Sequence, residues 1–211
     1  MIIQIGEHAV AIGQTGSGKT FFIKNGVLPA YNRIIVLDTE EMQFNEFPAV
    51  SINKALSLAR SNYSFYVRVI MYGNIEEDAE ALDDLCRGLL DYGHDLVLYI
   101  DEITDFSTPT SIPSSLLSLI RKARKRTISV IVGTQRPQLL NKSFLVNSVH
   151  QFYFYIDEYD ANYLHRYAPF LSDNLSEIPY GSYMCIYYHH GEITIIEPVD
   201  EYDWSKRIRR K

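Results

Sequence analysis

The chain has 211 residues, which fits one domain better than two independent cores. It is 46% hydrophobic and 22% charged, a composition that is typical of a folded globular protein and argues against a disordered or fibrous chain. The formal net charge of -6 excludes a protein that attracts nucleic acid or an anionic membrane over its whole surface, so any contact with a polyanion has to be local.

Cysteine usage and hydropathy indicate the compartment. Cys86 and Cys185 are too few for a disulfide framework, and we expect both to be buried thiols. No apolar run approaches the roughly 20 residues that a spanning helix needs, and the first residues lack the basic start of a secretory signal. We therefore expect a soluble intracellular protein with no transmembrane segment.

Six short apolar runs rich in β-branched residues predict buried strands. In chain order they are 9–13, 33–38, 65–72, 96–101, 128–133 and 151–156. Helical patterns separate them, the clearest over 75–90, where Leu82, Leu85 and Leu89 share one face. This alternation predicts an α/β fold with a mostly parallel sheet flanked by helices on both faces.

The end of the chain departs from that alternation. Two strand-like runs, 181–186 and 192–197, flank a polar stretch at 187–191 and predict a C-terminal antiparallel hairpin. We therefore expect a single domain over 1–211. It has a motif core at about 7–160, a hairpin at about 180–198 and a basic tail at 206–211.

A glycine-rich motif follows the first predicted strand directly. It satisfies G-x-x-x-x-G-K-[ST] and consists of Gly13, Gln14, Thr15, Gly16, Ser17, Gly18, Lys19 and Thr20. Glycines let consecutive backbone N–H groups converge on phosphate oxygens, Lys19 neutralises the β and γ phosphates, and Thr20 offers a hydroxyl to Mg²⁺. A chance match to a glycine-rich turn is the alternative, but the flanking strand and helix disfavour it. The motif predicts a site for ATP and Mg²⁺.

Two carboxylates end the fourth predicted strand. Asp101 and Glu102 reach the carboxyl edge of the sheet, where open α/β folds bind their ligands. We predict that Asp101 holds Mg²⁺ through water and that Glu102 acts as the general base on the attacking water. Acidic residues also commonly begin loops, which is the alternative for this pair. A water-activating carboxylate favours hydrolysis over a kinase reaction, which must exclude water.

A polar residue follows the fifth predicted strand. Gln135 is expected at the same sheet edge, where its amide can accept from water and donate to the γ-phosphate at once. The alternative is an ordinary polar loop residue.

These motifs together resemble the FtsK/HerA superfamily of P-loop DNA-pumping ATPases, with a RecA/ASCE-like core. Three stretches carry the resemblance: GQTGSGKT, LVLYIDE and ARKRTISVIVGTQRPQ. The resemblance covers about residues 7 to 160. It implies that the Gln135 strand lies between the P-loop strand and the Asp101 strand, so that all three motifs surround one γ-phosphate.

The resemblance also assigns a role to Arg124, which lies ten residues before Thr134. Arg124 is at the border of the apolar face of a predicted helix over 111–126, and in a closed ring it would reach the ATP of the adjacent subunit. Two alternatives stay open for this basic run, a solvated helix face and a nucleotide-kinase lid.

Within the superfamily, the chain is most similar to the genome-packaging ATPases of membrane-containing icosahedral double-stranded DNA viruses. This rests on the expected lack of an added N-terminal barrel, membrane segments or a DNA-reading tail. The resemblance implies a ring of five or six copies, contacts to the phosphates of duplex DNA, a capsid or vertex protein as partner, and a place in the host cytoplasm or the virion. After the second strand, Asp38 stands where the family more usually has Asp-Pro, and no catalytic role is assigned to it.

Two weaker signals have simpler explanations. The basic tail at 206–211 is a candidate DNA contact, but a frayed solvated terminus is the preferred interpretation. His189 and His190 are expected at a hairpin tip rather than in a metal site. Two other functions stay open: a small-molecule P-loop kinase, and a secretion or pilus-type assembly ATPase that acts on protein.

Overall fold

The computed structural model describes residues 3–39, 43–71 and 75–208, with side chains except those of residues 75, 76, 123, 124 and 208. The predicted alternation of strands and helices is present. The strands are β1 (Ala9–Ile12), β2 (Arg33–Asp38), β3 (Phe65–Ile70), β4 (Leu96–Ile100), β5 (Ile128–Thr134), β6 (His150–Tyr153), β7 (Cys185–His189) and β8 (Glu192–Ile196). The α-helices are α1 (Lys19–Phe22), α2 (Ile52–Arg60), α3 (Ile75–Tyr92), α4 (Ser114–Lys122), α5 (Lys142–Asn147), α6 (Glu158–Leu164), α7 (Leu171–Asn174) and α8 (Trp204–Ile208).

All eight strands form one sheet in the order β3-β2-β4-β5-β1-β6-β7-β8. The strands from β3 to β6 in this order pair in parallel, and β7 and β8 add an antiparallel hairpin at one edge. This confirms the predicted α/β class and the C-terminal hairpin. It also places β5 between β4 and β1, as the resemblance implied.

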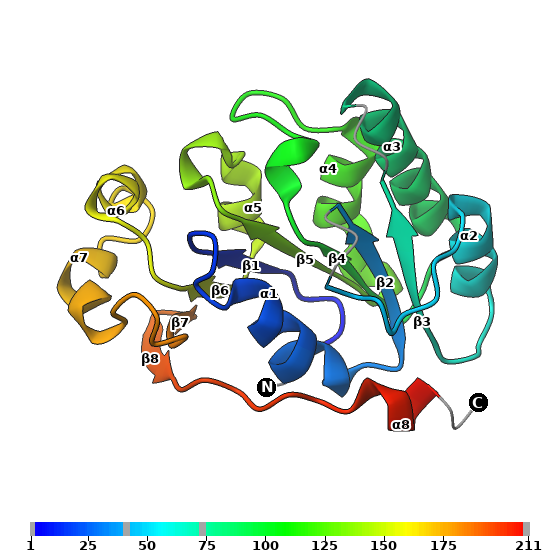
Figure 1. Cartoon of the computed structure of the whole chain (residues 1–211). Coiled ribbons are helices and arrows are strands. Elements are labelled where there is room, and N and C mark those ends of the chain that lie inside the picture. Colours follow the sequence, from blue (N-terminus) through cyan, green and yellow to red (C-terminus); the bar gives the residue numbers. More distant parts are fainter. Residues whose placement is uncertain (1–2, 40–42, 72–74, 209–211) are drawn as a thin grey trace.

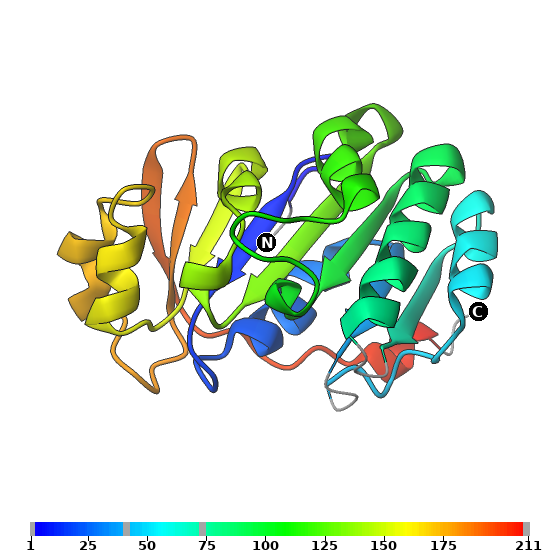
Figure 2. The same ribbon diagram turned by 90° about the horizontal axis from the view of Figure 1, so that it is seen from above.

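Helices cover both faces of the sheet (Figure 1). The helices α2, α3, α4 and α5 lie on one face, and α1 and α8 lie on the other, as the view from above also shows (Figure 2). Side chains of successive strand residues point to opposite faces. In β1, Val10 and Ile12 pack in the core under α2, α3, α4 and α5, whereas Ala9 and Ala11 pack in the core under α1 and α8. Because both faces are buried, the central strands are apolar throughout, and this is why they stood out in the sequence.

Several predicted boundaries differ from the observed ones. The helix expected over 111–126 begins only at Ser114, after Pro113, and its end at Ala123–Arg126 is a 3-10 turn. The sixth strand ends at Tyr153 rather than 156, because the chain beyond it turns to the P-loop, where Tyr155 O accepts from Gln14 N at 3.0 Å.

The hairpin is tighter than predicted. Residues 187–189 belong to β7, and the turn consists only of His190 and Gly191, both with positive φ (49° and 90°). At the other end, β7 starts at Cys185 rather than 181 because the preceding residues form a turn in which Ser182 N donates to Pro179 O at 3.0 Å. Those preceding residues lie close to the P-loop, as described below.

The start of the basic tail is docked rather than frayed. Trp204 is buried and packs edge-on against the ring of Phe47, with centroids 4.8 Å apart. The guanidinium of Arg207 donates to Asn32 Oδ1 at 2.8 Å and lies over the Tyr66 ring. The expectation of a solvated terminus is therefore wrong for Arg207, because aromatic packing of Trp204 holds α8 against the body, whereas the side chain of Lys206 is exposed. Residues 209–211 of the predicted tail lie outside the described residues.

Candidate functional site

The P-loop connects β1 to α1 in a conformation that requires its glycines. Gly16 and Gly18 have φ values of 76° and 93°, in the left-handed region that side chains with a Cβ rarely adopt. A Cβ on Gly13 would lie 2.6 Å from the Cβ of Phe154, so the loop can pass Phe154 only without one. The sequence therefore folds locally into the compact loop that P-loop chemistry needs.

The hydroxyl of Thr20 and the carboxylate of Asp101 meet at the carboxyl end of β4. Thr20 Oγ1 donates to Asp101 Oδ1 at 2.8 Å, and both residues are buried. The hydroxyl of Tyr99 donates to the same carboxylate oxygen. Burial and the Asp101 charge raise the pKa of Tyr99 well above its usual value, so Tyr99 remains a protonated donor. Two hydroxyl groups thus fix the position of one carboxylate oxygen.

Glu102 points the other way, toward β5. Its Oε2 accepts from the backbone N–H of Gln135 at 2.8 Å. Its Oε1 accepts from both the hydroxyl and the backbone N–H of Thr104, the latter at 3.3 Å. The two carboxylates at the end of β4 therefore have different partners, in line with the different orientations of successive residues.

Gln135 links the P-loop to this second carboxylate. Its side-chain Oε1 accepts from the hydroxyl of Thr15, while its backbone N–H contacts Glu102. The strand order makes this possible, since β5 lies between β1 and β4. Three predicted site residues, which follow three adjacent strands, are thus brought to one place on the sheet edge.

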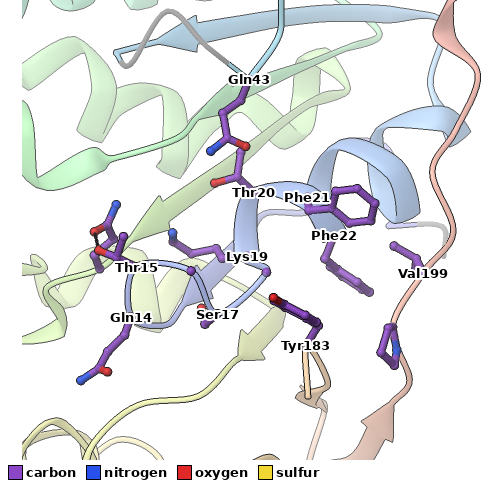
Figure 3. Close-up of a pocket in the computed structure, with 14 residues that line it drawn as sticks. Gln14, Thr15, Ser17, Lys19, Thr20, Phe21, Phe22, Gln43, Tyr183 and Val199 are labelled. Atoms are coloured by element: carbon purple, nitrogen blue, oxygen red, sulfur yellow. Dashed lines mark hydrogen bonds between the residues drawn. The ribbon is translucent and has the colours of Figure 1, made fainter. Parts of the chain in front are cut away.

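A cavity of about 530 Å³ lies over the P-loop (Figure 3). Its size is within the range of small-molecule sites. Lys19 is buried and extends along the inside of the loop toward Thr15, and Gln43 lies above Thr20 (Figure 3). The cavity is lined by Gln14, Thr15, Gly16, Ser17, Gly18, Lys19, Thr20, Phe21, Phe22, Gln43, Gln135, Tyr183, Pro198 and Val199.

Part of this lining was missed in the sequence. Tyr183 precedes β7 and Pro198 and Val199 follow β8, so the hairpin supplies one wall of the cavity. These residues carry no motif and lie beyond the stretch with the family resemblance. Phe21, which directly follows the P-loop in the sequence, is the aromatic residue of this lining that stands next to a recognisable motif.

Other residues considered in the sequence make different contacts. Asp38 forms a buried ion pair with Arg68 of β3 at 3.0 Å and so contributes to the packing between adjacent strands. Gln14 turns its amide outward and donates to Asp157 Oδ2 at 2.8 Å. The side chain of Arg124 lies outside the described part of the chain.

The described residues fit Mg²⁺. The hydroxyl of Thr20 and the carboxylate of Asp101 are hard oxygen donors of the kind that this ion prefers, and they lie side by side beside the P-loop. No cluster of three or more His, Cys, Asp or Glu suited to a metal occurs among residues 3–39, 43–71 and 75–208. A magnesium ion here would therefore depend on phosphate and water for its remaining ligands.

In those same ranges, no helix is both long and apolar enough to cross a membrane.

Comparison with known proteins supports the resemblance predicted from the sequence. No protein-family model matches the chain. Protein P9 of Pseudoalteromonas phage PM2 is 27% identical over 140 residues, which cover 65% of this chain and 63% of Protein P9. The match thus spans less than two thirds of that relative.

Solved structures match over nearly the whole chain. The genome-packaging NTPase B204 from Sulfolobus turreted icosahedral virus 2, in complex with ATP-gammaS, has a TM-score of 0.77 and 19% identity, covering 94% of this chain and 100% of B204. VirB4 of Thermoanaerobacter pseudethanolicus has a TM-score of 0.65 and 10% identity, covering 95% of this chain and 91% of VirB4. The pCW3 conjugation coupling protein TcpA has a TM-score of 0.61 and 14% identity, covering 97% of this chain and 63% of TcpA.

These likenesses define the class of fold. The chain has the fold of the P-loop ATPases, and its resemblance to viral genome-packaging ATPases is confirmed at that level.

Proposed function

We propose that this chain is the ATPase of a viral genome-packaging motor, which hydrolyses ATP and, as a ring of subunits, drives double-stranded DNA into a preformed capsid. The observation that carries the ATPase part is the connected set of hydrogen bonds from Thr15 through Gln135 to Glu102. This set lies beside the Thr20–Asp101 pair at one edge of the sheet. The packaging part is supported by the likeness to B204 along that protein's whole length.

The reaction assigns a separate task to each side of the site. Lys19 and the loop amides hold the β and γ phosphates, and Mg²⁺ on Thr20 and Asp101 would offset their charge. The Glu102 carboxylate takes a proton from a water, whose oxygen bonds to the γ-phosphorus as the bond to the bridging oxygen breaks. Gln135, held by Thr15, orients that water and the γ-phosphate. The products are ADP and inorganic phosphate.

Two further elements of the proposal concern neighbours. Arg124 of an adjacent subunit would stabilise the charge on the transferring phosphoryl group, which requires a closed ring of five or six copies. Duplex DNA would be held through its phosphates by Lys and Arg, without reading of base sequence. A capsid or vertex protein would receive the motor.

A decisive experiment is the ATPase rate with and without duplex DNA across a salt series, together with the particle mass. We expect a ring-sized particle whose rate rises with DNA at low salt, and a stimulation that falls steeply as salt increases. A monomeric protein at full activity, or transfer of phosphate to a nucleoside without any effect of DNA, would reject the motor.

A second candidate is an assembly or secretion ATPase that acts on protein, favoured by the likeness to VirB4 over 95% of this chain. In the same assay, hydrolysis insensitive to duplex but stimulated by a membrane-bound partner would decide for it.

Mixed rings test the shared site. Arg124→Ala and Glu102→Gln subunits are each expected to be inactive alone. Mixing them should restore activity, because a site with an intact Glu102 can then receive Arg124 from its neighbour. No recovery in rings shown by mass to be mixed would exclude donation of Arg124 across the interface.

A further inference from the structure

The cavity over the P-loop has two chemically different ends. Polar side chains gather around Lys19, Thr20 and Gln135, where the phosphates would bind. The opposite end is formed by Phe21, Phe22, Tyr183, Pro198 and Val199, of which only the tyrosine carries a side-chain hydrogen-bonding group. In Figure 3, Phe21, Phe22, Tyr183 and Val199 lie on the side of Thr20 away from Thr15. We call these five residues the apolar wall.

We propose that the apolar wall is the nucleobase site, that the ring of Tyr183 stacks on the base, and that the site therefore accepts GTP nearly as well as ATP. This rests on the proposed function only in requiring that the P-loop binds a nucleoside triphosphate. It assigns a binding role to the C-terminal hairpin.

The position of Tyr183 is the first argument. A Cβ on Gly18 would lie 3.0 Å from Cδ1 of Tyr183, so the tyrosine ring packs directly against the P-loop. Tyr183 is nevertheless 55% exposed as a residue, and in the described part of the chain its ring forms no pair with another aromatic ring. A large ring fixed at one side and open toward a cavity is suited to stacking on a planar ligand.

The backbone at Tyr183 is the second argument. Its φ is 56°, in the left-handed region that is costly for a residue with a bulky side chain. The preceding turn, with Gly181 at a φ of 81°, leads the chain into this conformation. Such strain persists where surrounding structure maintains it and is concentrated at ligand sites. Here the strained residue is the one that brings an aromatic ring to the P-loop.

The chemistry of the wall is the argument for tolerance of the base. Strong discrimination between adenine and guanine needs buried hydrogen-bonding groups that one base satisfies and the other does not. The side chains of Phe21, Phe22, Pro198 and Val199 offer none. Stacking on an aromatic ring tolerates every base because every base has a π-face. The amide of Gln43 lies above Thr20, toward the phosphate end (Figure 3).

The test separates the base from the phosphates by direct binding. Dissociation constants are measured by calorimetry for non-hydrolysable ATP and GTP analogues and for inorganic tripolyphosphate, which lacks a base. We expect the two analogues to bind wild type within about 5-fold of each other. Tyr183→Ala should weaken both about 10-fold, as expected for one base–aromatic stack, and leave tripolyphosphate within about 2-fold.

Two controls complete the design. Tyr183→Phe keeps the ring and should bind both analogues like wild type. Tyr63→Ala removes a tyrosine that is 79% exposed and lies outside the cavity lining, so it should also bind both analogues like wild type. Retained tripolyphosphate binding shows that Tyr183→Ala has folded around its P-loop. If that variant weakens tripolyphosphate as much as ATP, or leaves ATP unchanged, the stacking assignment is wrong.

If the GTP analogue binds more than about 100-fold more weakly than the ATP analogue, the site does not tolerate both bases and that part of the proposal is wrong. These measurements also distinguish this inference from the motor. Analogues that bind as described to a protein whose hydrolysis ignores DNA would reject the motor and retain the base site.

Discussion

The two ends of the nucleotide cavity come from parts of the fold that are built differently. The phosphate end lies on β1, β4 and β5, parallel central strands whose ends converge on one edge of the sheet. The other end comes from residues on either side of the antiparallel hairpin β7–β8. At the first end hydrogen bonds hold the side chains of Thr20, Asp101, Glu102 and Gln135, whereas at the second, aromatic rings and aliphatic groups offer mainly apolar surface.

The two ends therefore contribute to different steps, one to the reaction and the other to binding. Charged and hydrogen-bonded groups at the phosphate end can act on the reacting atoms, so changes there should affect turnover by orders of magnitude. Contacts at the hairpin end bind the base equally well in the ground state and in the transition state. Changes there should therefore alter nucleotide affinity and leave kcat nearly constant.

The largest effect is expected for Lys19→Ala. Lys19 is buried inside the P-loop, and its removal leaves the β and γ phosphates without a counter-charge. We expect nucleotide binding and hydrolysis to be lost, with an affinity more than about 100-fold weaker. Calorimetric titration with a non-hydrolysable ATP analogue measures this. Lys54→Ala, at an exposed position of α2, is the control and should bind normally.

Glu102→Gln should separate binding from chemistry. The amide keeps the shape of the side chain but cannot take a proton from water, so kcat should fall about 10²- to 10⁴-fold while ATP stays bound. Single-turnover hydrolysis and ATP binding are measured on the same sample, with Glu80→Gln on the exposed side of α3 as control. Normal turnover in Glu102→Gln would remove the general base from the proposal.

The phosphate end was largely predictable from the sequence, because most of its residues lie in short continuous stretches of chain. Gly13 to Thr20 form one continuous loop, and Asp101 and Glu102 directly follow an apolar strand, so their positions depend on short stretches of chain. The contact between Gln135 and Glu102 needed the strand order, which came from the family resemblance.

The hairpin end could not be predicted because its geometry depends on distant packing. Tyr183 reaches Gly18 across 165 residues, through the pairing of β7 with β6 and an uncommon backbone angle. Apolar wall residues have no periodicity or motif that differs from ordinary core and surface positions. The docking of α8 was missed for the same reason, since it depends on where Trp204 meets distant rings.

A smaller effect is expected for Thr104→Val, which removes one hydroxyl donor from Glu102 and keeps the shape of the side chain. This hydrogen bond helps to hold the Glu102 carboxylate in place, so its loss should leave the general base less well positioned. We expect kcat to fall about 5- to 10-fold with little change in KM. Thr110→Val, at an exposed position in the same loop, should leave both constants unchanged. An unchanged kcat in Thr104→Val would mean that Thr104 does not position the base.

The smallest effect concerns the junction between the two regions, where α6 follows β6 and Asp157 binds the P-loop residue Gln14. Burial and the nearby Asp157 charge raise the pKa of Asp160 from its usual value to about 6, and its Oδ1 is buried without a hydrogen-bond partner. Between about pH 4 and pH 6 the folded state therefore binds more protons than the unfolded state. Stability should fall as pH rises through this window.

Asp160→Asn removes this charge and keeps the side-chain shape. We expect it to stabilise the fold by about 1 to 2 kcal/mol at pH 8, or about 3 to 6 °C in Tm, and by almost nothing at pH 4, where the wild-type carboxyl is protonated in the folded state. Thermal unfolding followed by circular dichroism at the two pH values measures the difference. Because Asp160 contacts neither end of the cavity lining, kcat should stay within about 2-fold of wild type. A gain of equal size at both pH values would show that the buried charge is not what destabilises this junction.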